Sequence, residues 1–257
     1  MSKYNSTNRF SNRAADYAKY RPHYPTEIVN WITSTFHVLP HVVIADLGAG
    51  TGISSELFLR QNFQVIAVEP NTEMRQTAIA YLEKYPNFSA VDGTAENTTL
   101  ADQSVDVIVS AQAFHWFDLQ LARKEFLRIL KPDGLVVLIW NERLIQSPFE
   151  IAYEKHILEY ATDYIQINHR NVDLEKIKNF FLPYDCHLNV FRNSQVLDYE
   201  GFKGRHLSSS FIPQEGDQNY AVMIKNFRQL FDEYQIADEI IINYDTKVYV
   251  AVIGNSN

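Results

Sequence analysis

One acidic residue and a glycine-rich turn stand where a chain could hold a small ligand. Asp46 ends a run of apolar, β-branched residues, and Gly48, Gly50 and Gly52 follow it at alternate positions. Glycines at this spacing permit a tight turn, because they adopt backbone conformations that other residues rarely adopt. A helix that follows would leave backbone N–H groups at the turn unpaired. The stretch therefore predicts a strand, a turn and a helix, with the turn able to approach a ligand closely.

A second acid, Glu69, ends the next apolar run, residues 64–69. In an open α/β sheet, an acid at this strand end, about twenty residues after the glycine turn, faces ribose hydroxyls. A carboxylate can accept hydrogen bonds from both hydroxyls of a vicinal diol. Alternatively, Glu69 interacts with the helix dipole at the N-terminus of a helix over residues 72–85. We predict that Glu69 binds the ribose of a ligand and that Pro70 and Met74 border the same pocket. Met74 also begins an apolar stripe typical of a core.

A titratable side chain, His115, lies in the sequence AQAFHWFD, residues 111–118, directly after an apolar strand at 105–111. In open α/β sheets, ligands bind outside the carboxyl ends of the strands where the strand order reverses. His115 has the one side chain of this loop with a pKa near neutral. It could therefore act as a general base or donate a hydrogen bond to a substrate. Equally, it could orient the loop by bonding to backbone.

The elements that must position these groups alternate between strands and helices. Strands are expected at 42–47, 64–69, 88–92, 105–111, 135–140, 187–199 and 248–253, and helices at 26–36, 72–85, 119–130 and 218–234. Residues 143–181 look mainly helical, and residues 131–134 form a turn. This order predicts an α/β fold with a doubly wound parallel sheet and helices on both faces.

Composition bounds the partners and the compartment. The chain has 257 residues, with 23 Lys and Arg against 31 Asp and Glu and a net charge of −8. This balance disfavours a nucleic-acid partner. The single Cys186 suits a reducing compartment, and no signal peptide or membrane span is evident, so we expect a soluble, cytoplasmic protein without a membrane partner. No metal-ligand cluster is apparent, and we expect a monomer or a homodimer.

The glycine turn is G-x-G-x-G after Asp46, one residue shorter than the G-x-G-x-x-G of dinucleotide folds. It resembles the first motif of the class I S-adenosylmethionine-dependent methyltransferases. Residues 10–25, FSNRAADYAKYRPHYP, are similar to the N-terminal segment of methyltransferases of the methyltransferase-11 type, and residues 199–213 resemble the substrate side of trans-aconitate-methyltransferase-like relatives. The resemblance covers about residues 10–141.

The resemblance implies one Rossmann-like domain, 1–257, with a mostly parallel seven-stranded sheet and a helical lid inserted after the fifth strand. Its parts would be an N-terminal cover (1–40), a cofactor-binding core (41–141), a lid and substrate region (142–237) and a closing strand (238–257).

By the same resemblance, two groups of residues would bind ligands. The cofactor residues would be Tyr20, Arg21, Asp46, Gly48, Ala49, Gly50, Thr51, Gly52, Glu69, Pro70, Met74, Gly93, Thr94, Ala95, Glu96, Ala111, Gln112 and Phe114. The substrate residues would be Tyr17, His115, Trp116 and Arg205, with Arg205 pairing a substrate carboxylate. The aromatic residues of the loop would favour a sulfonium. Some residues at 92–96 could be turn formers only, Arg205 could be a solvated arginine, and the N-terminal tyrosines could cap the core.

The implied activity is methyl transfer from S-adenosyl-L-methionine to a small-molecule acceptor by in-line displacement, with a carboxylic acid as one candidate. A carboxylate is already ionised and needs no base. A phenol, amine or carbon acid would need His115 or Tyr17 to remove a proton. Two alternatives are a non-catalytic regulatory protein that binds the cofactor and a nicotinamide dehydrogenase. The glycine spacing and Asp46 disfavour the dehydrogenase.

Overall fold

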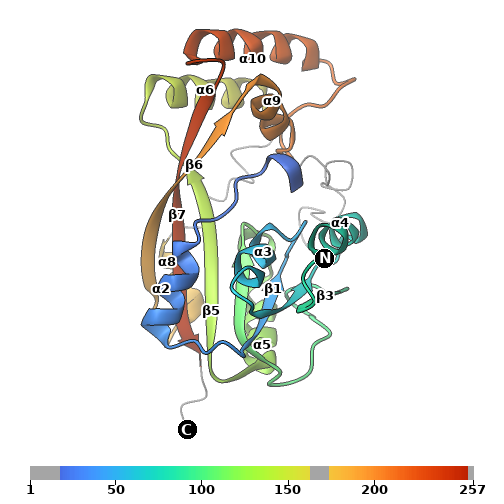
Figure 1. Ribbon diagram of the computed structural model, residues 1–257, viewed down its shortest axis with the longest axis vertical. Coiled ribbons are helices and arrows are strands. Elements are labelled where there is room, and N and C mark those ends of the chain that lie inside the picture. The colour runs from blue at the N-terminus through green and yellow to red at the C-terminus, as the bar shows by residue number, and fades with distance from the viewer. Residues whose placement is uncertain (1–17, 163–173, 254–257) are drawn as a thin grey trace.

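The computed structural model describes residues 18–162 and 174–253 of the chain. Its centre is a seven-stranded sheet in the order β3-β2-β1-β4-β5-β7-β6 (Figure 1). The strands are β1 (Val43–Leu47), β2 (Gln64–Val68), β3 (Phe88–Val91), β4 (Val105–Ala111), β5 (Leu130–Arg143), β6 (His187–Leu197) and β7 (Ile240–Ile253). The pairs are parallel except those that β7 makes with β5 and β6. The predicted Rossmann-like, mostly parallel seven-stranded α/β fold is confirmed.

The strand order reverses between β1 and β4, which lie side by side and pair in parallel. Both strands are apolar and almost wholly buried, as expected of parallel strands covered on two faces. Their carboxyl ends carry the glycine turn and residues 111–118, respectively. The two predicted ligand loops therefore begin at neighbouring strand ends, where a switch point of this fold binds ligands.

Helices cover both faces of the sheet. On one face lie α2 (Glu27–Phe36), α3 (Ile53–Leu59) and α4 (Thr72–Leu82), and on the other lie α5 (Leu119–Ile129) and α8 (Leu174–Phe181). Each helix buries one apolar side against the sheet, for example Ile32 of α2 and Phe126 of α5. Phe180 and Phe181 of α8 join the second core.

Three further helices lie together beyond the ends of β5, β6 and β7 (Figure 1). They are α6 (Pro148–Tyr160), α9 (Tyr199–Leu207) and α10 (Tyr220–Tyr234), and we call them the cap helices. They share an apolar cluster with the first half of β7, centred on Phe202 and Phe227, whose rings stack 4.2 Å apart. Helix α6 begins with a capping box made by Ser147 and Glu150.

The structure differs from the sequence predictions in the second half of the chain. Residues 143–181 are predicted to be mainly helical and part of a lid, but α8 within them packs in the core, whereas β6 agrees with the strand predicted at 187–199. Strand β7 begins at Ile240 instead of residue 248, because its alternating apolar residues face the cap. Residues 131–134, predicted to form a turn, lie within β5. The pairing of β5 with β4 changes register there, and Asp133 has a φ of 60°. The helix predicted on the surface at 218–234 buries Met223 and Phe227.

Within residues 18–162 and 174–253, no helix has the length and apolar character that crossing a membrane requires.

Two histidines of the cap helices, His156 and His206, are buried. Burial lowers the pKa of His156 from 6.5 to about 4, and burial lowers that of His206 well below 6.5. A group with a lowered folded-state pKa binds fewer protons folded than unfolded, so its stabilising contribution is lost as the pH falls below 6.5.

We therefore expect the free energy of unfolding to fall between pH 7 and about pH 4, with each histidine contributing a slope of up to about 1.4 kcal/mol per pH unit. His156→Phe keeps a ring beside Phe227 and removes one titrating group, so its slope should be shallower. Urea denaturation at a series of pH values measures both slopes. Equal slopes for wild type and variant would contradict this assignment.

Candidate cofactor site

The three glycines of the turn have different surroundings. Gly48, Gly50 and Gly52 all adopt positive φ, at 69°, 58° and 85°. A Cβ at Gly48 would lie 2.6 Å from the Cβ of Ala113, and one at Gly52 would lie 2.7 Å from Leu82 Cδ1. A Cβ at Gly50 would meet none of the described residues within 4 Å. Two glycines therefore allow close packing, and the middle one faces open space that a ligand could enter.

Glu69 is joined to this turn by a hydrogen bond. Its Oε2 accepts from the backbone N–H of Gly50 at 2.8 Å, and its Oε1 accepts from the N–H of Asn71 at 2.9 Å. The side chain is buried, and burial raises its pKa. Each carboxylate oxygen has two lone pairs, so each retains acceptor capacity for a ligand hydroxyl. The geometry suits a diol placed beside Gly50.

Arg75 holds the same strand end and is a residue that the sequence reading missed. Its Nη1 donates to the backbone carbonyl of Glu69 at 2.5 Å, and its Nη2 donates to Asp92 Oδ2 at 3.3 Å. It thereby links the ends of β2 and β3. The sequence signal for this contact was a basic residue in the first turns of the helix that follows β2.

Asp46 is fully buried near the end of β1, and its side chain reaches the first turn of α3. Its Oδ2 accepts hydrogen bonds from the hydroxyls of Ser54 at 2.6 Å and Ser55 at 2.7 Å. Its Oδ1 has no hydrogen-bond partner among the described residues. Burial raises its pKa to about 6. The side chain therefore fixes the turn to the helix, and one oxygen retains capacity to accept a further bond.

The other predicted neighbours of the turn lie around it. Ala49, Thr51 and Met74 are buried, and Pro70 is half-buried at the end of β2. Their predicted cofactor contacts remain predictions.

Residues 92–96 form a compact turn. Thr94 and Asn97 exchange backbone hydrogen bonds of 3.0 and 3.2 Å, and Gly93 packs against the backbone of Thr98. Ala95 is buried. Glu96 Oε1 accepts from the N–H of Asp118 at 2.8 Å, so this turn is tied to the end of the loop at 111–118. These contacts agree with the turn-forming alternative, and the predicted adenine contacts remain predictions.

The loop at 111–118 approaches the glycine turn and has a strained start. Ala111 is buried, and Gln112, with a φ of 56°, donates through its backbone N–H to Ile139 and through Nε2 to the carbonyl of Asn141. Phe114 lies wholly in the core, edge-on to Phe180 at 4.8 Å. Phe114 therefore packs in the core, and its predicted contact with the cofactor remains a prediction. Other rings of this loop would have to form an aromatic wall beside a sulfonium.

His115 and Trp116 are adjacent in a short 3-10 helix, Phe114–Trp116, with ring centroids 4.8 Å apart. Burial lowers the pKa of His115 to about 4. Its imidazole is therefore neutral at pH 7 and weakly basic. This favours the two non-catalytic interpretations, a hydrogen-bond donor or a loop-orienting residue, and its substrate contact remains a prediction.

The remaining predicted residues lie at the cap helices. Arg21 Nη2 donates to the carbonyl of Ser208 at 2.9 Å and to the hydroxyl of Ser209 at 3.4 Å, and Arg205 Nη1 donates to the same hydroxyl at 3.3 Å. The ring of Tyr20 packs against α9 at Gly204. The structure thus brings Arg21 and Arg205 together. Tyr17 lies outside the described residues.

Arg143 is a third arginine of this group, and the sequence reading missed it. It pairs with Glu154, and its guanidinium lies 4.5 Å above the ring centroid of Tyr153. Burial raises the pKa of Tyr153, and the charges of Arg143, Arg205 and Arg21 oppose this rise. Arg143 lies over the Tyr153 ring, whereas Arg21 and Arg205 both donate to the hydroxyl of Ser209. We call these three residues the arginine cluster.

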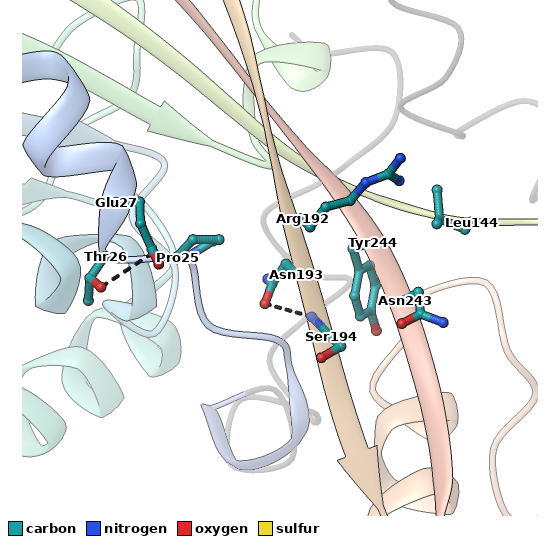
Figure 2. Close-up of a pocket in the computed structure, with 9 residues that line it drawn as sticks. All are labelled: Pro25, Thr26, Glu27, Leu144, Arg192, Asn193, Ser194, Asn243 and Tyr244. Carbon is teal, nitrogen blue, oxygen red and sulfur yellow. Dashed lines mark hydrogen bonds between the residues drawn. The ribbon is translucent and has the colours of Figure 1, made fainter.

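A groove of about 580 Å³ opens between the start of α2 and the β6–β7 pair (Figure 2). Its lining residues are Pro25, Thr26, Glu27, Leu144, Arg192, Asn193, Ser194, Asn243 and Tyr244. The hydroxyl of Tyr244 lies 3.4 Å from Arg205 Nε, so the groove adjoins the arginine cluster. The predicted cofactor residues are not among those that line it.

Comparison with known proteins identifies the family. A family model described as a methyltransferase domain matches residues 45–138. A methyltransferase-like protein of Schizosaccharomyces pombe is 35% identical over 245 residues, which cover 93% of each chain. A second S. pombe methyltransferase is 38% identical over 52% of this chain and 53% of its own length. The chain belongs to the class I S-adenosylmethionine-dependent methyltransferases.

Solved structures show the same fold at low identity. The YcgJ protein of Bacillus subtilis is 17% identical, with a TM-score of 0.56, over 90% of this chain and 100% of its own. Phosphoethanolamine N-methyltransferase 2 of Haemonchus contortus, solved with S-adenosyl-L-methionine, is also 17% identical, with a TM-score of 0.56, over 98% of this chain and 58% of its own.

The different surroundings of the glycines predict different losses of stability. Gly50→Ala adds only the strain of a positive φ, so it should lower the free energy of unfolding by about 1–2 kcal/mol. Gly52→Ala adds the same strain and a clash with Leu82, so its loss should be larger, about 2–4 kcal/mol. Denaturant unfolding of both variants measures the difference, and an equal or reversed order would contradict the packing role of Gly52.

Proposed function

We propose that this methyltransferase binds S-adenosyl-L-methionine at the glycine turn and transfers its methyl group to a small-molecule acceptor, with a carboxylic acid as the favoured class. The observation that carries the cofactor assignment is the bond between Glu69 and Gly50. Through this bond a buried carboxylate lies beside the glycine of the turn that faces open space, an arrangement that supports binding of a ribose diol. When bound, the cofactor supplies an electrophilic methyl group.

The residues present fit an adenosyl cofactor. Glu69 would hold the ribose hydroxyls, and the open space at Gly50 would admit the chain that joins the nucleoside to the methionine part. Residues 92–96 and 111–118 are tied together by the bond from Glu96 to Asp118, so they could border the base from one side. The solved Haemonchus enzyme contains this cofactor, which supports the same assignment here.

The arginine cluster supports an anionic acceptor. Guanidinium groups bind carboxylates through two parallel hydrogen bonds, and Arg21 and Arg205 converge on one hydroxyl, that of Ser209. A carboxylate is ionised at neutral pH and needs no base. Neither nearby side chain is available as a base at neutral pH. Burial lowers the pKa of His115 to about 4, so its imidazole is weakly basic, and burial raises the pKa of Tyr153, so its phenol stays protonated. The reaction would then depend on alignment and on exclusion of water.

Replacing Glu69 tests the cofactor site. Glu69→Ala should weaken binding of S-adenosylhomocysteine by about 1–3 kcal/mol, the cost of losing hydrogen bonds to a charged group. Isothermal titration calorimetry measures this change, with NAD as the control ligand. Glu73→Ala, which removes an exposed acid from the first turn of α4, is the matched control and should bind like wild type. If the wild type binds NAD or neither ligand, the proposed cofactor is wrong.

Replacing Arg205 tests the acceptor class. Wild type is first assayed with S-adenosyl-L-methionine against small mono-, di- and tricarboxylic acids, amines, phenols and phosphate monoesters. With an accepted carboxylic acid, Arg205→Lys should raise the acceptor KM about tenfold or more, because an ammonium group cannot form the two-bond fork. Its affinity for S-adenosylhomocysteine should stay unchanged, and Lys203→Ala on the same helix should behave like wild type.

Turnover only with amines or phenols would exclude the carboxylic-acid proposal. Turnover with phosphate monoesters would retain the arginine cluster and change the acceptor class. Cofactor binding without turnover of any acceptor would favour a regulatory protein.

A further inference from the structure

Residues 20–23 lie between the cap and the core. On the cap side, Arg21 Nη2 donates to the carbonyl of Ser208 in the segment after α9. On the core side, His23 Nδ1 lies 3.8 Å from Oε2 of Glu56, a buried residue of α3. Figure 1 shows this stretch, in blue, rising from α2 toward α9. We call residues 20–23 the strap.

One backbone carbonyl of the strap is held by two side-chain amides. The carbonyl of His23 accepts from Asn193 Nδ2 at 2.7 Å and from Asn141 Nδ2 at 3.4 Å. The two asparagines come from different strands, β6 and β5, and contact each other at 3.3 Å. Asn141 Oδ1 also accepts from the hydroxyl of Thr246 in β7 at 2.5 Å. Three strands thus converge on a single carbonyl group.

The buried members of this arrangement have fixed positions. Asn141 and Thr246 are directly opposite each other in the β5–β7 ladder, and both are buried. A buried polar group is costly to leave without its partner, so a network of this kind is held in one geometry. A further amide, Gln195 Nε2, donates to the carbonyl of Tyr20 at 3.1 Å. The strap is therefore bound at both ends through side chains of β6.

The same network reaches the loop that adjoins the glycine turn. The backbone carbonyl of Asn141 accepts from Nε2 of Gln112, whose positive φ begins the loop at 111–118. On the other side of the strap, the N–H of Glu56 donates to the carbonyl of Gly52 at 2.9 Å. His23 is thus connected through two short routes to both loops of the candidate cofactor site.

We propose that Asn141 and Asn193 are positioning residues that hold the strap closed beside the cofactor site, so that strap closure and cofactor retention are linked. A ligand that needs the closed strap binds more weakly as the closed fraction falls, because its apparent dissociation constant is divided by that fraction. The inference rests on the proposed function only in the identity of the ligand. The hydrogen bonds to His23 are independent of it.

Two substitutions at Asn193 test the proposal. Asn193→Ala removes the amide, and Asn193→Asp keeps its shape but replaces the donor by an acceptor. Asn189→Ala is the matched control, because Asn189 lies four residues earlier on the same face of β6 and its Oδ1 accepts the local N–H of Val190. Hydrogen–deuterium exchange of the backbone amides of residues 18–24 reports opening of the strap, and calorimetry with S-adenosylhomocysteine reports affinity.

For both Asn193 variants we expect exchange in residues 18–24 to be at least about tenfold faster and the dissociation constant to rise about five- to thirtyfold, the range for losing one or two hydrogen bonds. Melting temperatures, measured beside that of Asn189→Ala, separate local opening of the strap from loss of the whole fold. Unchanged exchange would overturn the holding role, and faster exchange with unchanged affinity would overturn the link to the cofactor. Failure of the wild type to bind would instead count against the proposed function, and exchange would still test the strap.

Discussion

The hydrogen bond from the Gly50 N–H to Glu69 joins the ends of the two strands on which the rest of the site is built. Strands β1 and β2 pair residue by residue up to Leu47 and Val68, and the ladder continues into the turn where Gly48 donates to Val68. Glu69 is buried, and its two backbone donors offset part of the cost of removing a carboxylate from water. The turn and the carboxylate are therefore mutually dependent.

The long antiparallel strands β5 and β7 have a second structural role, because they carry the sheet from the cofactor core to the cap. Their ladder runs from Gly134 paired with Ile253 to Arg143 paired with Tyr244. The core end is apolar on both faces, and the cap end carries Asn141, Arg143 and Tyr244. One continuous pair of strands thus supports the glycine-turn region and positions the arginine cluster. Rigid elements of this kind hold side chains more precisely than loops do.

The sequence predicted the local features of the site, and it failed where distant segments meet. The glycine spacing, the acid at the end of β2 and the alternation of strands and helices are local patterns, and the predicted fold was confirmed. By contrast, Arg21 and Arg205 reach the same hydroxyl, that of Ser209, only because the strap passes from the core to the segment after α9. Helix α8 packs in the core because Ile177, Phe180 and Phe181 share one face, a pattern that equally suits a lid. No local pattern identifies which partner such a face meets.

Acidic side chains border the glycine turn, and three arginines lie near the cap helices. The acids are Asp46 and Glu69. The arginines are Arg205 of α9, Arg21 of the strap and Arg143 of β5, which pairs with Glu154 of α6. A sulfonium cofactor would be favoured beside the acids, and an anionic acceptor beside the arginines, each by Coulomb attraction that low dielectric strengthens. Under the proposed function, this polarity would orient the two reactants toward each other before any proton moves. In-line displacement needs this alignment more than it needs a base, which is consistent with the weakly basic His115.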